Sequence, residues 1–216
     1  MAAGNLDQAM PSDEALDPGL SARVDAAAAV LRSGGIVVYP TETLYALGAR
    51  ADDAAALQRL ARAKLRPEGK PLPLLAADRE QVRQVARLDG PAARAADRFW
   101  PGPLTLVLPA GPGLDLAVTA GSGTVGIRIP GSAVARALAR RAGFALVSTS
   151  ANPAGGPSPA RVADLDRGLL GQVDHVLDGG PTPGGAASTV VRIEGSIVHV
   201  VREGAIPAAA IEEALR

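Results

Sequence analysis

The stretch Ile36-Val-Val-Tyr-Pro-Thr-Glu-Thr-Leu-Tyr45 decides the fold class, because a β-branched apolar run passes directly into a polar turn. Its first four residues predict a buried strand that ends at Pro40. Two hydroxyls and a carboxylate follow where the strand ends, which is where open α/β sheets place their ligands. The stretch therefore favours a site for a small polar molecule. The alternative is an ordinary turn in which Thr41 caps a helix.

Helical and strand patterns alternate on both sides of this stretch. Helices are expected at residues 21–31, from 52 or 53 to 61, from 78 onward, and at 91–100, 132–143 and 161–170. Strands are expected at residues 36–39, 72–75, 104–108, 125–129, 145–147, 175–177, 188–193 and 197–201, the last two as a hairpin. This alternation, with a hairpin among the strands, predicts one α/β domain: a twisted, mixed β-sheet flanked by helices.

The domain is expected to span residues 21–207. Residues 1–20 are polar and acidic and contain two prolines, so they predict a flexible N-terminal extension, within which Met10 is an alternative start. Residues 208–216 are expected to form a short C-terminal helix.

The bulk composition limits the function. The chain has 216 residues, a formal net charge of zero and no cysteine. The balanced charge argues against a protein that coats nucleic acid by bulk electrostatics, and the lack of cysteine excludes disulfides and thiolate metal sites. His175 and His199 stand far apart, and no metal site is predicted. Without a long apolar run or a secretory signal, a cytoplasmic protein is expected, with no membrane partner.

Both lysines of the chain lie in one short segment, Lys64-Leu-Arg-Pro-Glu-Gly-Lys70. Together with Arg66 they place three cations in a few residues, which indicates an anionic partner. Arginine offers a bidentate fork and lysine a mobile point charge, so the segment suits phosphate groups. The alternative is a solvated basic end of a helix, favoured by the helix dipole.

A second polar cluster, Ser148-Thr-Ser-Ala-Asn152, follows an apolar strand, with Gly155, Gly156 and Ser158 behind it. Hydroxyls, an amide and approachable backbone N–H groups can hold phosphate or ribose. The alternative is an ordered turn.

Thr124 and Arg128 flank the expected strand at 125–129, and their spacing places both on one face. A buried arginine on a strand needs an anionic partner, whereas an edge-strand arginine in solvent does not. Arg202 follows the final strand in the same way. The sequence contains no recognisable Ser-His-Asp motif, HExxH motif or useful carboxylate pair. The clusters therefore favour binding and positioning of an anionic substrate, with electrostatic rather than covalent catalysis.

Seven motifs together resemble the YrdC/TsaC family and cover residues 22–206 in the expected order. They are Tyr39-Pro-Thr-Glu-Thr-Leu-Tyr45, Lys64-x-Arg66-Pro67, Trp100-Pro-Gly-Pro-Leu-Thr-Leu106, Thr124-Val-Gly-Ile-Arg-Ile-Pro130, Ser148-Thr-Ser-Ala-Asn152, Ser188-Thr-Val190 and Arg202-x-Gly204. The resemblance implies a YrdC-like catalytic domain with a deep, positively lined cleft.

The activity that the resemblance implies is synthesis of L-threonylcarbamoyladenylate from L-threonine, bicarbonate and ATP, with release of pyrophosphate. Mg²⁺ would accompany the ATP. The product would pass to the transferase proteins that make the t⁶A modification at position 37 of tRNA. Weak direct binding of tRNA stays open.

The resemblance also implies roles for individual residues. The residues expected to hold threonine are Thr43, Arg128 and Ser148. Lys64 and Arg66 are the expected catalytic cations. The residues expected to bind ATP are Lys64, Arg66, Lys70, Thr124, Ser150, Asn152, Ser158, Ser188 and Arg202.

Two other functions remain as alternatives. One is a double-stranded RNA-binding module, since a local basic site can hold a phosphate backbone. Zero net charge and few aromatic residues disfavour it. The other is a domain that forms a carbamoyl-adenylate from carbamoyl phosphate, which the lack of attached zinc-finger or acylphosphatase-like segments disfavours.

Overall fold

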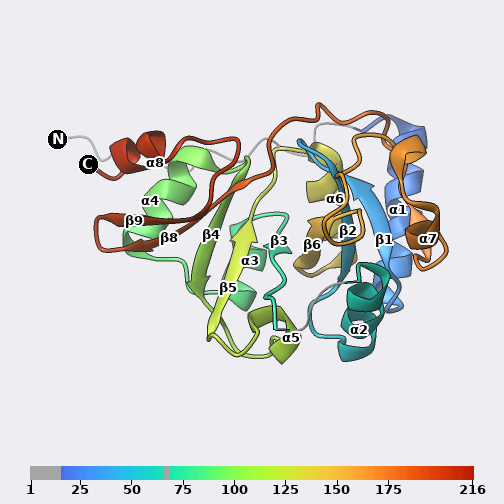
Figure 1. The fold of residues 1–216 in the computed structure, drawn as a ribbon, viewed down its shortest axis with the longest axis horizontal. Coiled ribbons are helices and arrows are strands. Elements are labelled where there is room, and N and C mark those ends of the chain that lie inside the picture. Colours follow the sequence, from blue (N-terminus) through green and yellow to red (C-terminus); the bar gives the residue numbers. More distant parts are fainter. Residues whose placement is uncertain (1–15, 66–68) are drawn as a thin grey trace.

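The structure is a computed structural model that describes residues 16–65 and 69–216 (Figure 1). Within these residues, one nine-stranded sheet has the order β7-β1-β2-β6-β3-β5-β4-β8-β9. Its strands are β1 (Val37–Pro40), β2 (Tyr45–Arg50), β3 (Leu74–Leu75), β4 (Leu104–Pro109), β5 (Thr124–Arg128), β6 (Leu146–Ser150), β7 (His175–Val176), β8 (Thr189–Glu194) and β9 (Ile197–Arg202). The pairs β1–β7, β3–β5 and β4–β8 are parallel and the others antiparallel, so the predicted mixed sheet is confirmed.

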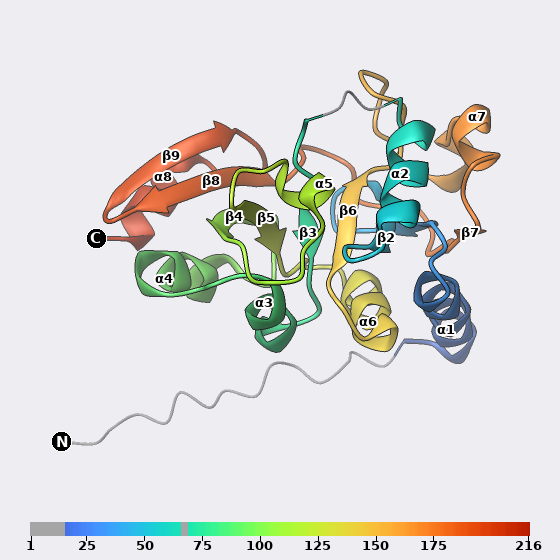
Figure 2. The same cartoon turned by 90° about the horizontal axis from the view of Figure 1, so that it is seen from below.

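Helices cover both sides of this sheet. They are α1 (Pro18–Arg32), α2 (Ala54–Ala63), α3 (Arg79–Val85), α4 (Gly90–Phe99), α5 (Leu116–Thr119), α6 (Ala133–Ala142), α7 (Arg167–Leu170) and α8 (Ala208–Ala214), with a 3₁₀ turn η1 (Val162–Asp164). Figure 2 shows α1 and α6 on the opposite side of β1, β2 and β6 from α2. Among the residues described, no helix has the length and apolar character needed to cross a membrane.

The hydrophobic core lies in two layers, one on each face of the sheet. Leu47, Val147 and Leu74 share one face and pack in the larger layer, which α2, α4 and α8 help to close. Val37, Tyr39 and Leu146 belong to the second layer, beneath α1 and α6. The buried faces of α1 and α6 are rich in alanine, which lets these two helices pack closely against each other and the sheet.

The second layer stops at β3, and this leaves part of a sheet face for polar residues. Arg128 on β5 lies opposite Leu75 on one side and, by the antiparallel register, beside Thr105 of β4 on the other. These positions share a face with Gly126 and Thr124. Apart from Leu75, none of these residues belongs to either apolar layer. The fold thus offers a polar surface over β5, β4 and the start of β8.

Three expectations about elements need correction. The first helix begins at Pro18 rather than Ser21, because Asp17 accepts a hydrogen bond from the Leu20 N–H and proline suits the first turn. No helix follows Thr41, because the chain turns back and forms β2, which the sequence did not indicate. The helix expected at 161–170 is broken into η1 and α7, because Asp166 caps a new helix through the Leu169 N–H.

The C-terminal helix forms where it was expected and packs into the main core. Ile211 on α8 is fully buried, and Leu215 just after it is nearly so, both in the layer that contains Trp100. Residues 208–216 therefore complete the hydrophobic core of the domain. A flexible extension was predicted for residues 1–20. Residues 1–15 lie outside the described residues, so for them the extension stays a prediction.

Candidate functional site

Thr41 shapes the turn between β1 and β2. Its hydroxyl donates to the Leu44 carbonyl at 2.7 Å and accepts from the backbone N–H groups of Thr43 and Leu44 at 3.2 Å each. It also lies 3.1 Å from the Thr43 hydroxyl. A threonine that bonds its own backbone in this way fixes a tight turn. The turn therefore presents Glu42 and Thr43 in a defined direction.

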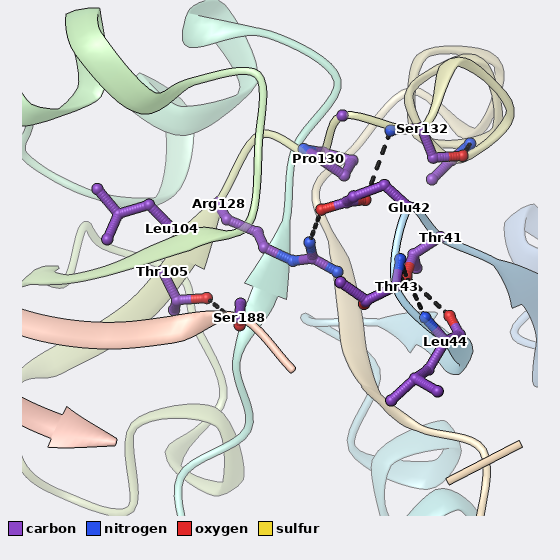
Figure 3. Close-up of polar contacts among 12 residues, drawn as sticks. Thr41, Glu42, Thr43, Leu44, Leu104, Thr105, Arg128, Pro130, Ser132 and Ser188 are labelled. Carbon is purple, nitrogen blue, oxygen red and sulfur yellow. Dashed lines mark hydrogen bonds and ion pairs between the residues drawn. The ribbon is translucent and has the colours of Figure 1, made fainter. Parts of the chain in front are cut away.

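Glu42 points from this turn across to Arg128 at the end of β5, and the two form an ion pair (Figure 3). The Arg128 and Glu42 side chains are only 9% and 17% exposed. The second carboxylate oxygen of Glu42 accepts from the Ser132 N–H at 3.4 Å, at the start of α6. Arg128 therefore has the anionic partner that a buried arginine on a strand needs. The ion pair connects the turn between β1 and β2 with the end of β5.

Tyr39 brings a buried hydroxyl next to this ion pair. Burial raises its pKa to about 12, while Ser148 and Arg128 act in the opposite direction. Within the described residues its hydroxyl makes no hydrogen bond of standard geometry, although Ser148 is close enough to affect its pKa. A Cβ at Gly48 would lie 2.8 Å from the Tyr39 ring, so glycine there makes room for the ring.

A second set of polar contacts connects β4, β8 and β9. The Arg202 guanidinium donates to the Ser188 carbonyl at 2.7 Å and to the Ser188 hydroxyl at 3.0 Å. The Ser188 hydroxyl lies 2.9 Å from that of Thr105 (Figure 3). Burial lowers the pKa of Arg202, and the guanidinium of Arg128 lowers it further. Two guanidinium groups within electrostatic reach of each other favour an anion bound near both.

Lys64 lies at the end of α2 and is nearly buried, with 3% of its surface exposed. Its ammonium group donates to the carbonyl of Ser150 and, at 2.7 Å, to that of Asn152. The Asn152 amide donates to the Gly156 carbonyl, while its Oδ1 is buried without a hydrogen-bond partner in the described residues. Lys64 therefore connects the end of α2 with the Ser148–Asn152 cluster, and it orders the end of β6.

These contacts bring cations, hydroxyls and one carboxylate together from both halves of the sheet. Glu42, Tyr39 and Ser148 come from the β1–β2–β6 half, whereas Arg128, Thr105 and Ser188 come from the β5–β4–β8 half. Such an arrangement can hold a ligand that carries several oxygen atoms and more than one charge. The described residues contain no group of three or more His, Asp or Glu side chains placed to hold a metal ion.

Residues 29–204 match the Sua5/YciO/YrdC family, whose description reads "telomere recombination". The chain belongs to this family. It is 42% identical over 158 residues to the threonylcarbamoyl-AMP synthase of Bacillus subtilis strain 168, and 41% identical over 169 residues to that of Thiobacillus denitrificans. These matches cover 71% and 78% of the chain, respectively. The crystal structure of Pyrococcus abyssi Sua5 complexed with L-threonine superposes with a TM-score of 0.84 and 36% identity, over 90% of the chain.

The relatives differ in length. The chain matches 45% of the Bacillus protein and 57% of the Pyrococcus structure, so it spans about half the length of these relatives. It matches 86% of the Thiobacillus protein.

The structure brings together most of the residues expected to form the family site. Thr43 and Ser148 lie near the ion pair that Arg128 forms with Glu42. On the side expected for the nucleotide, the structure connects Lys64 with Ser150 and Asn152, and Arg202 with Ser188. Thr124 begins β5 on the same face as Arg128, and its hydroxyl lies 2.9 Å from that of Ser122.

Two expected residues of the described part of the chain, Lys70 and Ser158, are exposed. Arg66 lies outside the described residues. Their roles in ATP binding stay predictions. The deep, positively lined cleft also stays a prediction, because the surface hollow of about 510 Å³ between α2 and α7 is lined by other residues, among them Arg59 and Arg167.

Sequence reasoning missed Tyr39 and Thr105 as members of the site, and it placed Glu42 in a polar cluster without pairing it with Arg128. For Glu42 a signal was available, because a buried strand arginine needs an anion and Glu42 is the carboxylate in the polar cluster after the first strand. In the sequence, Tyr39 has the pattern of an ordinary core residue in a buried strand. Thr105 gave no signal, since its role depends on the pairing of β4 with β8.

Proposed function

We propose that this chain joins L-threonine, bicarbonate and ATP into L-threonylcarbamoyladenylate and releases pyrophosphate, which makes it a nucleotidyltransferase. The observation that carries the proposal is the buried Arg128–Glu42 pair, surrounded by hydroxyls and adjoining Arg202, in a chain about 40% identical to threonylcarbamoyl-AMP synthases. The Pyrococcus relative of the same fold is described as complexed with L-threonine, which supports an amino-acid site in this domain.

The proposed reaction needs positioning more than a protein nucleophile. The threonine amine and bicarbonate give a carbamate and water. A carbamate oxygen then attacks the α-phosphorus of ATP, the bond to the β-phosphate oxygen breaks, and pyrophosphate leaves in line. ATP enters as its Mg²⁺ complex, so the metal belongs to the substrate.

Each side of the site has a task in this reaction. Arg128, Thr43 and Ser148 would hold the threonine beside β5 and β6. Arg202 and the segment from Lys64 to Lys70 would offset the negative charge that grows on the phosphates. Lys64 would also act through the loop it orders, because its ammonium donates to the carbonyls of Ser150 and Asn152.

The unstable adenylate would pass to the proteins that transfer its threonylcarbamoyl group to tRNA for the t⁶A modification at position 37. These proteins would be the partners of the chain. The proposal does not require a direct contact with tRNA.

The test is pyrophosphate release from MgATP, measured with and without L-threonine and with and without bicarbonate. We expect release to need both co-substrates. Release that proceeds equally well without threonine would contradict the proposal, and release that instead needs carbamoyl phosphate would replace it with the carbamoyl-adenylate reaction.

A further inference from the structure

We propose that Glu42 determines substrate specificity by binding the α-ammonium group of the amino acid, so that the Glu42–Arg128 pair receives the whole zwitterion. The inference rests on the proposed function, since it names how the same site selects an α-amino acid. It gives a specific task to Glu42, the carboxylate of the polar cluster that follows the first strand.

The geometry holds Glu42 firmly in place. One carboxylate oxygen pairs with Arg128 and the other accepts from the Ser132 N–H at 3.4 Å. A Cβ at Gly131 would lie 3.4 Å from the Cγ of Glu42, so the glycine lets the chain pass directly against this side chain. Figure 3 shows the Arg128 guanidinium lying between Glu42 and Thr43. Cation, carboxylate and hydroxyl thus stand side by side.

The charge balance selects the class of ligand. The two side chains are 9% and 17% exposed, so the pair is largely removed from water and is neutral as a whole. A ligand with only a carboxylate would approach Arg128 and leave Glu42 facing a second anion, which is costly in a buried site. A zwitterion keeps the site neutral, because its carboxylate can share Arg128 while its ammonium group meets Glu42.

The neighbouring hydroxyls fit the rest of such a ligand. Tyr39 is fully buried, lies close enough to Arg128 and Glu42 for both to affect its pKa, and makes no standard hydrogen bond within the described residues. Thr43 and Ser148 add two further hydroxyls. An amino acid with a side-chain hydroxyl can therefore satisfy several groups at once. The ammonium group gives up one proton to water before the amine reacts with bicarbonate. The carbamate nitrogen keeps one hydrogen, which can still donate a hydrogen bond to Glu42.

The test compares two ligands that differ only in the amine. L-Threonine and (R)-3-hydroxybutyrate share the carboxylate and the hydroxyl, and calorimetry measures the affinity of each for wild type and for Glu42→Gln. Glutamine keeps the size of the side chain but removes its charge. We expect wild type to bind threonine at least about tenfold tighter than hydroxybutyrate, and Glu42→Gln to lose about tenfold or more for threonine alone. The matched control is Glu80→Gln on the exposed face of α3, which should change neither affinity.

Every other pattern overturns the inference. An equal loss for both ligands would make Glu42 a support for Arg128 only, and tighter binding of both would make it a competitor for Arg128. Unchanged affinities would remove it from the site. If Glu42→Gln does not fold, the wild-type comparison still decides, because equal affinity for the two ligands contradicts ammonium recognition. Threonine-dependent turnover without the expected Glu42→Gln pattern would defeat this inference alone, whereas a folded wild type without threonine binding would defeat the proposed function as well.

Discussion

Lys64 is a buried cation whose substitution should affect both stability and activity. From the sequence alone, Lys64→Ala is expected to leave the fold intact because the side chain would face the site. In the structure its ammonium group donates to two carbonyls at the end of β6. We therefore expect Lys64→Ala to lower the free energy of unfolding by roughly 1.5–3 kcal/mol, as well as the rate of pyrophosphate release.

Urea unfolding checks this prediction, with Lys70→Ala as the matched control for stability. Lys70 is exposed, so its removal should change the free energy of unfolding by less than about 0.5 kcal/mol. Equal stability of Lys64→Ala and wild type would show that the two carbonyls find other partners.

Tyr39 and Tyr45 should make the protein sensitive to alkaline pH. Burial raises the pKa of each to about 12, above the value of about 10 in an unfolded chain. Between these values the unfolded tyrosines lose their protons while the folded ones keep them, so the free energy of unfolding falls as pH rises from 10 to 12. The loss is at most about 1.4 kcal/mol per pH unit for each tyrosine, and it is absent below pH 10.

The check is urea unfolding at pH 9 and pH 11 for wild type and Tyr39→Phe. Phenylalanine removes the titrating hydroxyl, so the variant should lose less stability between the two pH values than wild type does. An identical loss in both proteins would show that Tyr39 ionises in the folded state as easily as in the unfolded one.

At the residue scale, the sequence indicated single polar contacts rather than the whole arrangement of the site. Arg128 was expected to need an anion and Thr43 to lie in a binding turn, and both lie beside Glu42. The sequence did not indicate which carboxylate pairs with Arg128 or that Lys64 donates to the Ser150 carbonyl, and each of these contacts joins residues 86 positions apart.

Gly204 packs against the backbone at Ser188 and Thr189, where β8 begins. A Cβ at Gly204 would lie 2.6 Å from backbone atoms of Ser188 and Thr189, which cannot move aside as a flexible side chain can. Gly204→Ala should therefore displace the start of β8, reduce the free energy of unfolding by about 1–3 kcal/mol and weaken ATP binding.

A thermal melt and a nucleotide titration measure both effects. Gly171→Ala at the end of α7 is the matched control, because a Cβ there meets nothing closer than 3.6 Å. It should be neutral or slightly stabilising. If Gly204→Ala behaves like Gly171→Ala, the close packing between Gly204 and Ser188 is not a constraint.

At the element scale, several helix starts could be predicted from local capping signals, whereas the pairing of distant strands could not. The helix at α2 was expected from Asp52 or Asp53, and Asp53 caps it through the Ala56 N–H at 3.0 Å. β2 was missed because Tyr45-Ala-Leu-Gly-Ala-Arg50 has no β-branched residue and becomes a strand through its neighbours β1 and β6. The need for glycine at position 48 is visible only in the folded chain, where the Tyr39 ring packs against it.

At the scale of the whole molecule, the class of the fold followed from the alternation of helices and strands, whereas the order of strands did not. The two-residue strand β3 joins β6 to β5 and so connects the two halves of the sheet. Each half contributes part of the site, with Glu42 and Ser148 on one and Arg128 and Ser188 on the other. The division into two halves could not be predicted from the sequence, because it arises from pairings between distant segments.

The central claim is that this one domain assembles a threonylcarbamoyl-adenylate, and product analysis with labelled bicarbonate tests it most directly. The chain alone is incubated with MgATP, L-threonine and ¹³C-bicarbonate. Mass spectrometry then measures the masses of the nucleotide products. We predict an adenylate that carries threonine and one ¹³C carbon, formed in step with pyrophosphate. An unlabelled threonyl-adenylate, or no adenylate from a folded protein that binds ATP and threonine, would contradict the account.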